Sequence, residues 1–133
     1  MLALIIGIEL LQKSQPLLSI HENNPVLQPL IDGFMSGVLD RLGELSSAIA
    51  SDDLAATKRV AHQFKGSAST YGFPQLAKSI GRLEERLLMR NALASQKNAI
   101  VDRFNLLVGE CACITSHGIR IGFDQSRYLL FAQ

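Results

Sequence analysis

Tryptophan is absent from the 133-residue sequence, and aromatic residues make up only 6% of it. We therefore do not expect a stacking platform for nucleic-acid bases. An excess of charge of one sign is also missing, because 13 basic residues face 12 acidic ones and the formal net charge is +1. This balance gives no electrostatic reason to expect nucleic acid or an anionic membrane surface as a partner.

Long hydrophobic runs are missing as well. Residues 1–11 are strongly apolar, but a membrane-spanning helix needs about 20 such residues. The stretch also lacks the basic leading region and the small-residue cleavage site of a signal peptide. We therefore expect residues 1–23 to be an N-terminal apolar segment that could form a short helix, and we expect no membrane span in this chain.

Cysteine is scarce, since the chain holds only Cys111 and Cys113. Two positions apart on a helix, they would project about 200° from each other, which disfavours both a disulfide and a shared metal. The lack of a disulfide framework suits a reducing compartment, so we expect a cytoplasmic protein with two small packing thiols. The cysteines and the three histidines match no metal-binding spacing, and we expect no metal site and no cofactor.

The length suits one domain with its own core. The composition, 47% hydrophobic and 19% charged, is typical of a soluble globular protein. Apolar residues recur at helical spacing, and strand patterns are almost missing before the tail. The sequence therefore predicts an all-α fold, an antiparallel up-down four-helix bundle over residues 24–118, followed by a C-terminal tail over residues 119–133.

The first two helices are predicted from their end signals. Asn24 followed by Pro25 predicts a helix start, and Ser51–Asp53 ends that helix and begins the second with acidic residues at its positive end. Gly72 predicts the end of the second helix. The first helix has one apolar stripe, formed by Leu27, Leu30, Ile31, Phe34, Val38, Leu42, Leu45 and Ile49.

Pro74 predicts the start of the third helix. Residues 91–95 read as a loop, with Ser95 as the N-cap of a fourth helix that ends at Gly118. The stripe of the third helix is Leu76, Ile80, Leu83 and Leu87, and that of the fourth is Ile100, Val101, Phe104, Leu107, Val108, Cys111 and Ile114. The apolar tail either packs on the bundle or covers a partner's surface.

The second predicted helix has two contrasting faces. On a wheel of about 100° per residue, the apolar Val60, Phe64 and Ala68 lie opposite His62 and form the core face. We therefore predict that the imidazole of His62 faces solvent. Within about 60° of it lie three cations and three small residues, which are Ala55, Lys58, Arg59, Lys65, Gly66 and Ser69.

The neighbours of His62 suit a phosphorylated imidazole. Lys65, one turn further on, can reach the added negative charge. Gly66 leaves bare backbone beside the ring, where a phosphoryl group or a partner's active site can come close. Lys58 and Arg59 extend the positive field and would favour an acidic docking partner.

Residues 61–72, AHQFKGSASTYG, resemble the signature of histidine-containing phosphotransfer (HPt) domains of two-component phosphorelays. Phe64 and Tyr71 replace leucines that are commoner in that family, on the buried face. The resemblance covers about residues 24–116, and its specific part, residues 61–84, ends at the Leu83–Glu84 pair of the following helix. It implies a four-helix bundle, in agreement with the periodicity.

The resemblance also implies the roles of the site residues. It makes His62 the phosphoaccepting residue, Lys65 the phosphoryl-stabilising residue and Gly66 the residue that gives access. The expected docking face for a receiver domain consists of Ala55, Lys58, Arg59, Gln63 and Ser69.

The implied function is that of a phosphorelay carrier, which accepts a phosphoryl group from one receiver aspartate and passes it to another. The sequence holds no glycine-rich nucleotide loop, so we expect a signalling domain that is not an enzyme by itself. The expected partners are response-regulator receiver domains, in particular that of a hybrid sensor kinase, and Mg²⁺ would belong to the receiver.

Two other functions are compatible with the residues. The first is a helical adaptor that binds a signalling partner through its apolar ends, residues 1–11 or 119–133. The second is an enzyme or metal site that uses His21, His62, His117 and the cysteines.

Overall fold

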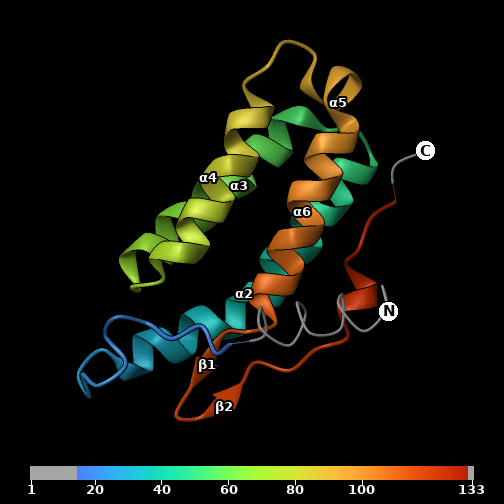
Figure 1. Ribbon diagram of the computed structural model, residues 1–133. Helices are drawn as coiled ribbons and strands as arrows, with labels where there is room; N and C mark the ends of the chain where they lie inside the picture. Colours follow the sequence, from blue (N-terminus) through green and yellow to red (C-terminus); the bar gives the residue numbers. More distant parts are fainter. Residues whose placement is uncertain (1–14, 132–133) are drawn as a thin grey trace, which may run out of the picture.

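The computed structural model describes residues 15–131, and most of them are helical (Figure 1). The predicted all-α class is therefore confirmed, although a small hairpin is added. In chain order the elements are α2 (Gln28–Ala50), α3 (Leu54–Thr70), α4 (Pro74–Leu87), α5 (Ala92–Ser95), α6 (Lys97–Cys111), β1 (Thr115–Ser116), β2 (Ile119–Arg120) and the 3-10 helix η1 (Gln125–Arg127).

The apolar stripes of the helices meet in one hydrophobic core. Helix α3 packs against both α2 and α4, and α4 also packs against α6. In the core the ring of Phe34 stacks on Phe73 at 5.1 Å between centroids and also contacts Tyr71 and Phe64 at 5.7 and 6.2 Å. One member of the predicted stripe was wrong, because Leu30 is 50% exposed.

Both ends of α3 agree with the sequence. The Asp53 carboxylate accepts a hydrogen bond from the backbone N–H of Ala56 at 3.1 Å and so satisfies one free donor of the first turn. After Thr70 the chain turns at Gly72, whose φ is +83°, a left-handed conformation that glycine adopts without strain. These two ends fix where α3 begins and stops along the bundle.

The predicted start of the first helix at Asn24 was wrong. The side chain of Asn24 accepts from the backbone N–H of Val26 at 3.0 Å and closes a local turn. Helix α2 begins at Gln28 instead, and Pro29 occupies its first turn. Asn24 and Pro25 are therefore turn residues that precede the helix.

Both predicted ends of the last helix were also wrong. The hydroxyl of Ser95 donates to the carbonyls of Arg90 and Asn91, so it caps no helix N-terminus. Helix α6 begins at Lys97 and ends at Cys111, well before Gly118. Both cysteines are buried thiols outside any disulfide, as predicted for packing residues.

The residues after α6 leave the helix because they pair with the N-terminal segment. Leu17 and Ile114 form a parallel bridge, in which Leu17 donates to Cys113 at 2.7 Å and Thr115 donates to Leu17 at 2.9 Å. On the other side, Ile121 donates to Ile114 at 2.9 Å. The segments on either side of the helices therefore form a small cap at one end of the molecule.

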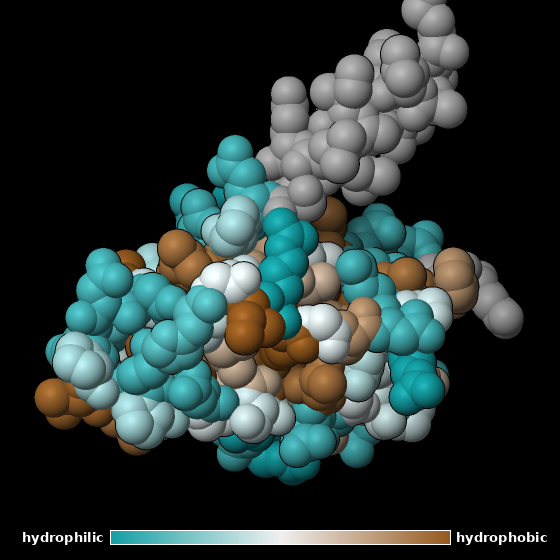
Figure 2. Space-filling view, turned by 90° about the horizontal axis from the view of Figure 1, so that it is seen from below, coloured by the Kyte–Doolittle hydropathy of each residue, from teal (hydrophilic) through white to brown (hydrophobic). Residues whose placement is uncertain are grey.

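Figure 2 shows this end, where hydrophobic residues gather near the middle of the face and hydrophilic residues surround them. The exposed hydrophobic residues of the two flanking segments include Leu18, Ile20 and Ile119. Most of the predicted N-terminal apolar segment, including its expected short helix, lies outside the described residues.

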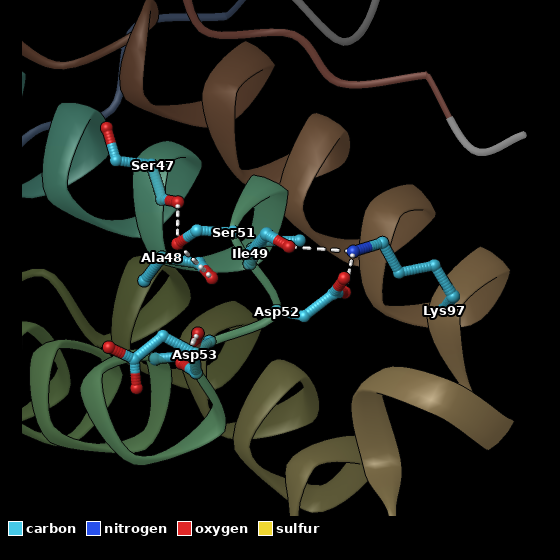
Figure 3. Close-up of polar contacts among 8 residues, drawn as sticks. Ser47, Ala48, Ile49, Ser51, Asp52, Asp53 and Lys97 are labelled. Atoms are coloured by element: carbon cyan, nitrogen blue, oxygen red, sulfur yellow. Dashed lines mark hydrogen bonds and ion pairs between the residues drawn. The ribbon is translucent and has the colours of Figure 1, made fainter.

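At the opposite end, one lysine joins three elements (Figure 3). The ammonium group of Lys97, in the first turn of α6, donates to the carbonyl of Ile49 and to the carboxylate of Asp52, both at 2.7 Å. A cation at the carbonyl end of a helix is favourable. Lys97 therefore holds the end of α2 and the α2–α3 turn against α6.

Candidate functional site

Helix α3 separates a buried face from an exposed one. Thr57, Val60, Ala61, Phe64 and Ala68 are its buried residues. The side chain of His62 is 82% exposed, which agrees with the predicted orientation. The residues expected to form the docking face, Ala55, Lys58, Arg59, Gln63 and Ser69, are all exposed as well.

A carboxylate from the neighbouring helix lies behind the imidazole. Oε2 of Glu84, on α4, is 3.6 Å from Nδ1 of His62, just beyond hydrogen-bond distance. Its other oxygen, Oε1, is buried and has no hydrogen-bond partner within the described part of the chain. A buried carboxylate oxygen without a hydrogen-bond donor costs free energy. Glu84 can therefore accept a hydrogen bond from either of its two neighbours, His62 and Lys65.

Lys65 is the second of those neighbours. Its ammonium nitrogen is 4.0 Å from Oε1 of Glu84, and its side chain is 46% exposed. The end of the lysine lies over Gly81 of α4, where an added Cβ would be 3.7 Å from the Lys65 Cε. Glu84 thus stands between the imidazole and the ammonium group, and the lysine remains partly free to turn outward.

Gly66 has open space around it, because a Cβ built there would meet no atom within 4 Å. Close helix packing is therefore not the reason for a glycine at this position. What the missing side chain leaves open is the surface beside His62.

The first helix also contributes to this surface. Arg41 of α2 donates from Nη1 to the side-chain oxygen of Gln63 at 2.9 Å. Arg41 also lines an open cavity of about 270 Å³ between α2 and α3, together with Gly33, Gly37 and Tyr71. Arg41 therefore adds a cation from a second helix to the positively charged side chains around His62.

Glu84 and Arg41 are the two site neighbours that the sequence did not reveal as such. Glu84 was noted only as part of the matching segment, and its approach to His62 depends on how α3 and α4 align along each other. No group of three metal-binding side chains occurs among residues 15–131.

The model of the Hpt domain family matches residues 29–112. The chain belongs to this family. Hpt domains are phosphocarrier signalling domains of two-component phosphorelays, and they interact with the receiver domains of response regulators. No curated protein and no solved structure matches the chain. Within its described part, this Hpt domain has no helix of the length and hydrophobicity that a membrane crossing requires.

Proposed function

We propose that His62 accepts a phosphoryl group from the aspartate of one receiver domain and passes it to the aspartate of another. The observation that carries this proposal is the 82% exposed imidazole with the Glu84 carboxylate 3.6 Å from its Nδ1. An exposed nucleophile with a carboxylate behind it is the arrangement expected of a nucleophile oriented by a third group.

Glu84 sets which nitrogen reacts. A carboxylate near Nδ1 favours the tautomer with the proton on Nδ1, so the lone pair of Nε2 faces outward. This nitrogen attacks the phosphorus of the receiver's aspartyl phosphate. An N–P bond forms while the P–O bond to the aspartate breaks, and the aspartate leaves as a carboxylate. The positive charge that develops on the ring is offset by Glu84, and onward transfer reverses the step.

Lys65 and Gly66 act on the phosphoryl group in this proposal. Lys65 turns from Glu84 toward the new phosphoryl oxygens, since a dianionic group attracts it more strongly than one partly exposed carboxylate. Gly66 lets the phosphoryl group and the receiver approach the backbone. The docking residues Lys58 and Arg59 guide the acidic active site of the receiver to this face.

We also propose that the long helices α2, α3, α4 and α6 form an antiparallel up-down four-helix bundle. Short turns join α2 to α3 and α3 to α4, and Lys97 links the start of α6 to the end of α2. At the other end, Gln28 of α2 donates to Ser116 after α6 at 2.6 Å. These contacts support opposite directions for α2 and α6.

The domain proposed here spans residues 24–118, flanked by segments 1–23 and 119–133. The family match, residues 29–112, lies inside these limits. We propose a cytoplasmic protein whose receiver partner belongs to a hybrid sensor kinase. The adaptor alternative is less favoured, because apolar residues of the tail from Ile121 to Leu130 are partly buried against the protein's own core.

A transfer assay tests the central assignment. A receiver domain carrying labelled phosphate is mixed with the wild-type chain, with His62→Gln and with His117→Gln, a control at another exposed histidine. Label should move to the wild type and to the control but not to His62→Gln. Equal labelling of His62→Gln would show that another residue is the acceptor.

A further inference from the structure

Helices α2 and α6 leave a groove between them, and the tail covers it. Of the long-helix pairs that pack side by side, these two make the least direct contact. The tail follows α6 on the side away from α4 (Figure 1). Its apolar residues are partly buried against the core, namely Ile121, Phe123, Tyr128, Leu129 and Leu130.

Asn105 of α6 binds the main chain of the tail. Its side-chain nitrogen donates to the carbonyl of Leu130 at 2.7 Å, and its side-chain oxygen accepts from the N–H of the same residue at 2.9 Å. An amide that pairs with both backbone groups of one residue binds the main chain, whatever the side chain of that residue.

Helix α2 forms the opposite wall of this groove. The hydroxyl of Ser46 donates to the carbonyl of Tyr128 at 3.3 Å. The ring of Tyr128 lies over Gly43, where an added Cβ would be 3.9 Å from the ring, and it meets Phe123 edge to face at 5.5 Å. Both helices therefore bind the backbone of the tail, in addition to the burial of its apolar residues.

The groove continues past the point where Asn105 forms its hydrogen bonds with the tail. A cavity of about 460 Å³ lies next to Leu130 and Phe131, and Ile49, Leu93 and Val101 supply apolar wall. Phe131 is 85% exposed beside it. Asp52 and Lys97 form a polar side of the same cavity. The helices thus offer more groove than the described tail fills.

We propose that the α2–α6 groove is a binding site for an apolar peptide, which residues 128–131 of the chain's own tail occupy as a detachable strap. The tail lies outside the residues that match the Hpt family. It contacts α2 and α6, whereas His62 and Glu84 belong to α3 and α4. Release of the strap therefore opens the groove without disturbing the proposed phosphotransfer site.

A peptide experiment on the full chain tests this proposal. Leu130→Pro removes the N–H that Asn105 accepts and should free the groove. A synthetic peptide of residues 124–131, blocked at both ends, should bind this variant at least about tenfold more tightly than the same peptide with proline at position 130. It should bind the wild type weakly, because a tethered strap competes at millimolar effective concentration. Equal binding of the two peptides, or none at millimolar concentration, would overturn the proposal.

Hydrogen exchange of the full chain gives a second test that needs no folded proline variant. In the wild type the Leu130 amide should exchange faster than the amides of α3, since the strap opens locally. In Asn105→Ala the protection factor of the Leu130 amide should fall at least about tenfold below its wild-type value, while the α3 amides keep theirs. Exchange of Leu130 only together with α3 would show that the tail is an inseparable part of the fold.

Discussion

The imidazole of His62 and the carboxylate of Glu84 form the central pair of the proposed site. They come from different helices, with 3.6 Å between Nδ1 and Oε2. In the proposed mechanism, the carboxylate therefore favours one tautomer of the ring and offsets its positive charge during transfer. Lys65, at 4.0 Å from the same carboxylate, offsets the charge of Glu84 in this structure, and we propose that it turns to the phosphoryl group on transfer.

Glu84→Gln should slow phosphoryl transfer to His62 about tenfold, corresponding to about 1.4 kcal/mol of lost transition-state stabilisation. The amide keeps the shape of the side chain but cannot offset positive charge on the ring. Rates of label transfer measure the effect, and Glu85→Gln, the exposed neighbouring carboxylate of α4, is the control. Equal rates for the two variants would remove Glu84 from the mechanism.

Gly66→Ala should have opposite effects on stability and transfer. An added methyl group meets no atom within 4 Å, so the better helix propensity of alanine should raise the free energy of unfolding by about 0.5–1 kcal/mol. The same methyl group should slow transfer, because it narrows the approach to His62.

The control for Gly66→Ala is Gly109→Ala in α6, a helical glycine that is also surrounded by open space. Urea unfolding should show similar stabilisation of both variants, and only Gly66→Ala should transfer more slowly. If both transfer at the wild-type rate, the glycine does not provide access.

At the scale of elements, the turns decide how α3 and α4 align. The Asp53 side chain caps the start of α3, and Gly72 reverses the chain before Pro74 starts α4. The N-terminal segment packs closely on this turn, since Ile20 donates its backbone N–H to the Gly72 carbonyl at 2.8 Å. Through this turn, the alignment places Glu84 beside His62.

Gly72→Ala should lower the free energy of unfolding by about 2–4 kcal/mol, from left-handed strain together with overpacking. An added Cβ would lie 2.7 Å from Oγ of Ser19 and 2.8 Å from atoms of Ile20 and His21. Gly118→Ala is the matched control, because its φ is +74° but its surroundings are open. Urea titrations should show a loss of only about 1–2 kcal/mol there; equal losses would mean that the contacts with residues 19–21 relax freely.

For the molecule as a whole, a thiol buried in the core makes the free energy of unfolding depend on pH in the alkaline range. Burial at the end of α6 raises the pKa of the Cys111 thiol well above its usual value, and the nearby Glu110 carboxylate adds to the shift. The unfolded chain exposes the same thiol, which ionises near pH 8.5. Above that pH the unfolded state loses a proton that the folded state retains, so the folded state becomes less stable.

The chain should therefore lose up to about 1.4 kcal/mol per pH unit from Cys111 above about pH 8.5, until the pH reaches the folded-state pKa. Cys111→Ala should be less stable at neutral pH, because it leaves a cavity, yet lose less stability between about pH 8 and 10. Urea unfolding over this range measures how steeply the free energy of unfolding falls with pH in the wild type and in the variant. Parallel curves would contradict a thiol that stays neutral in the core.

Much of this molecule follows from local patterns. The α3 boundaries were predictable because an acidic cap and a left-handed glycine act within one turn of the residues they affect. The exposure of His62 followed from helical periodicity alone. The start of α2 was not predictable in this way, because Asn24 has equally good partners in a turn and in a cap.

The sequence by itself determined the exposed trio of His62, Lys65 and Gly66, since residues three and four apart share one side of any helix. Only the tertiary structure decided that Glu84 lies behind the imidazole, because that requires two helices to be aligned along their lengths. It also decided that the chain leaves α6 at Cys111, since Ile114 there pairs with Leu17. That pairing joins residues 97 positions apart in the sequence, beyond the reach of local periodicity.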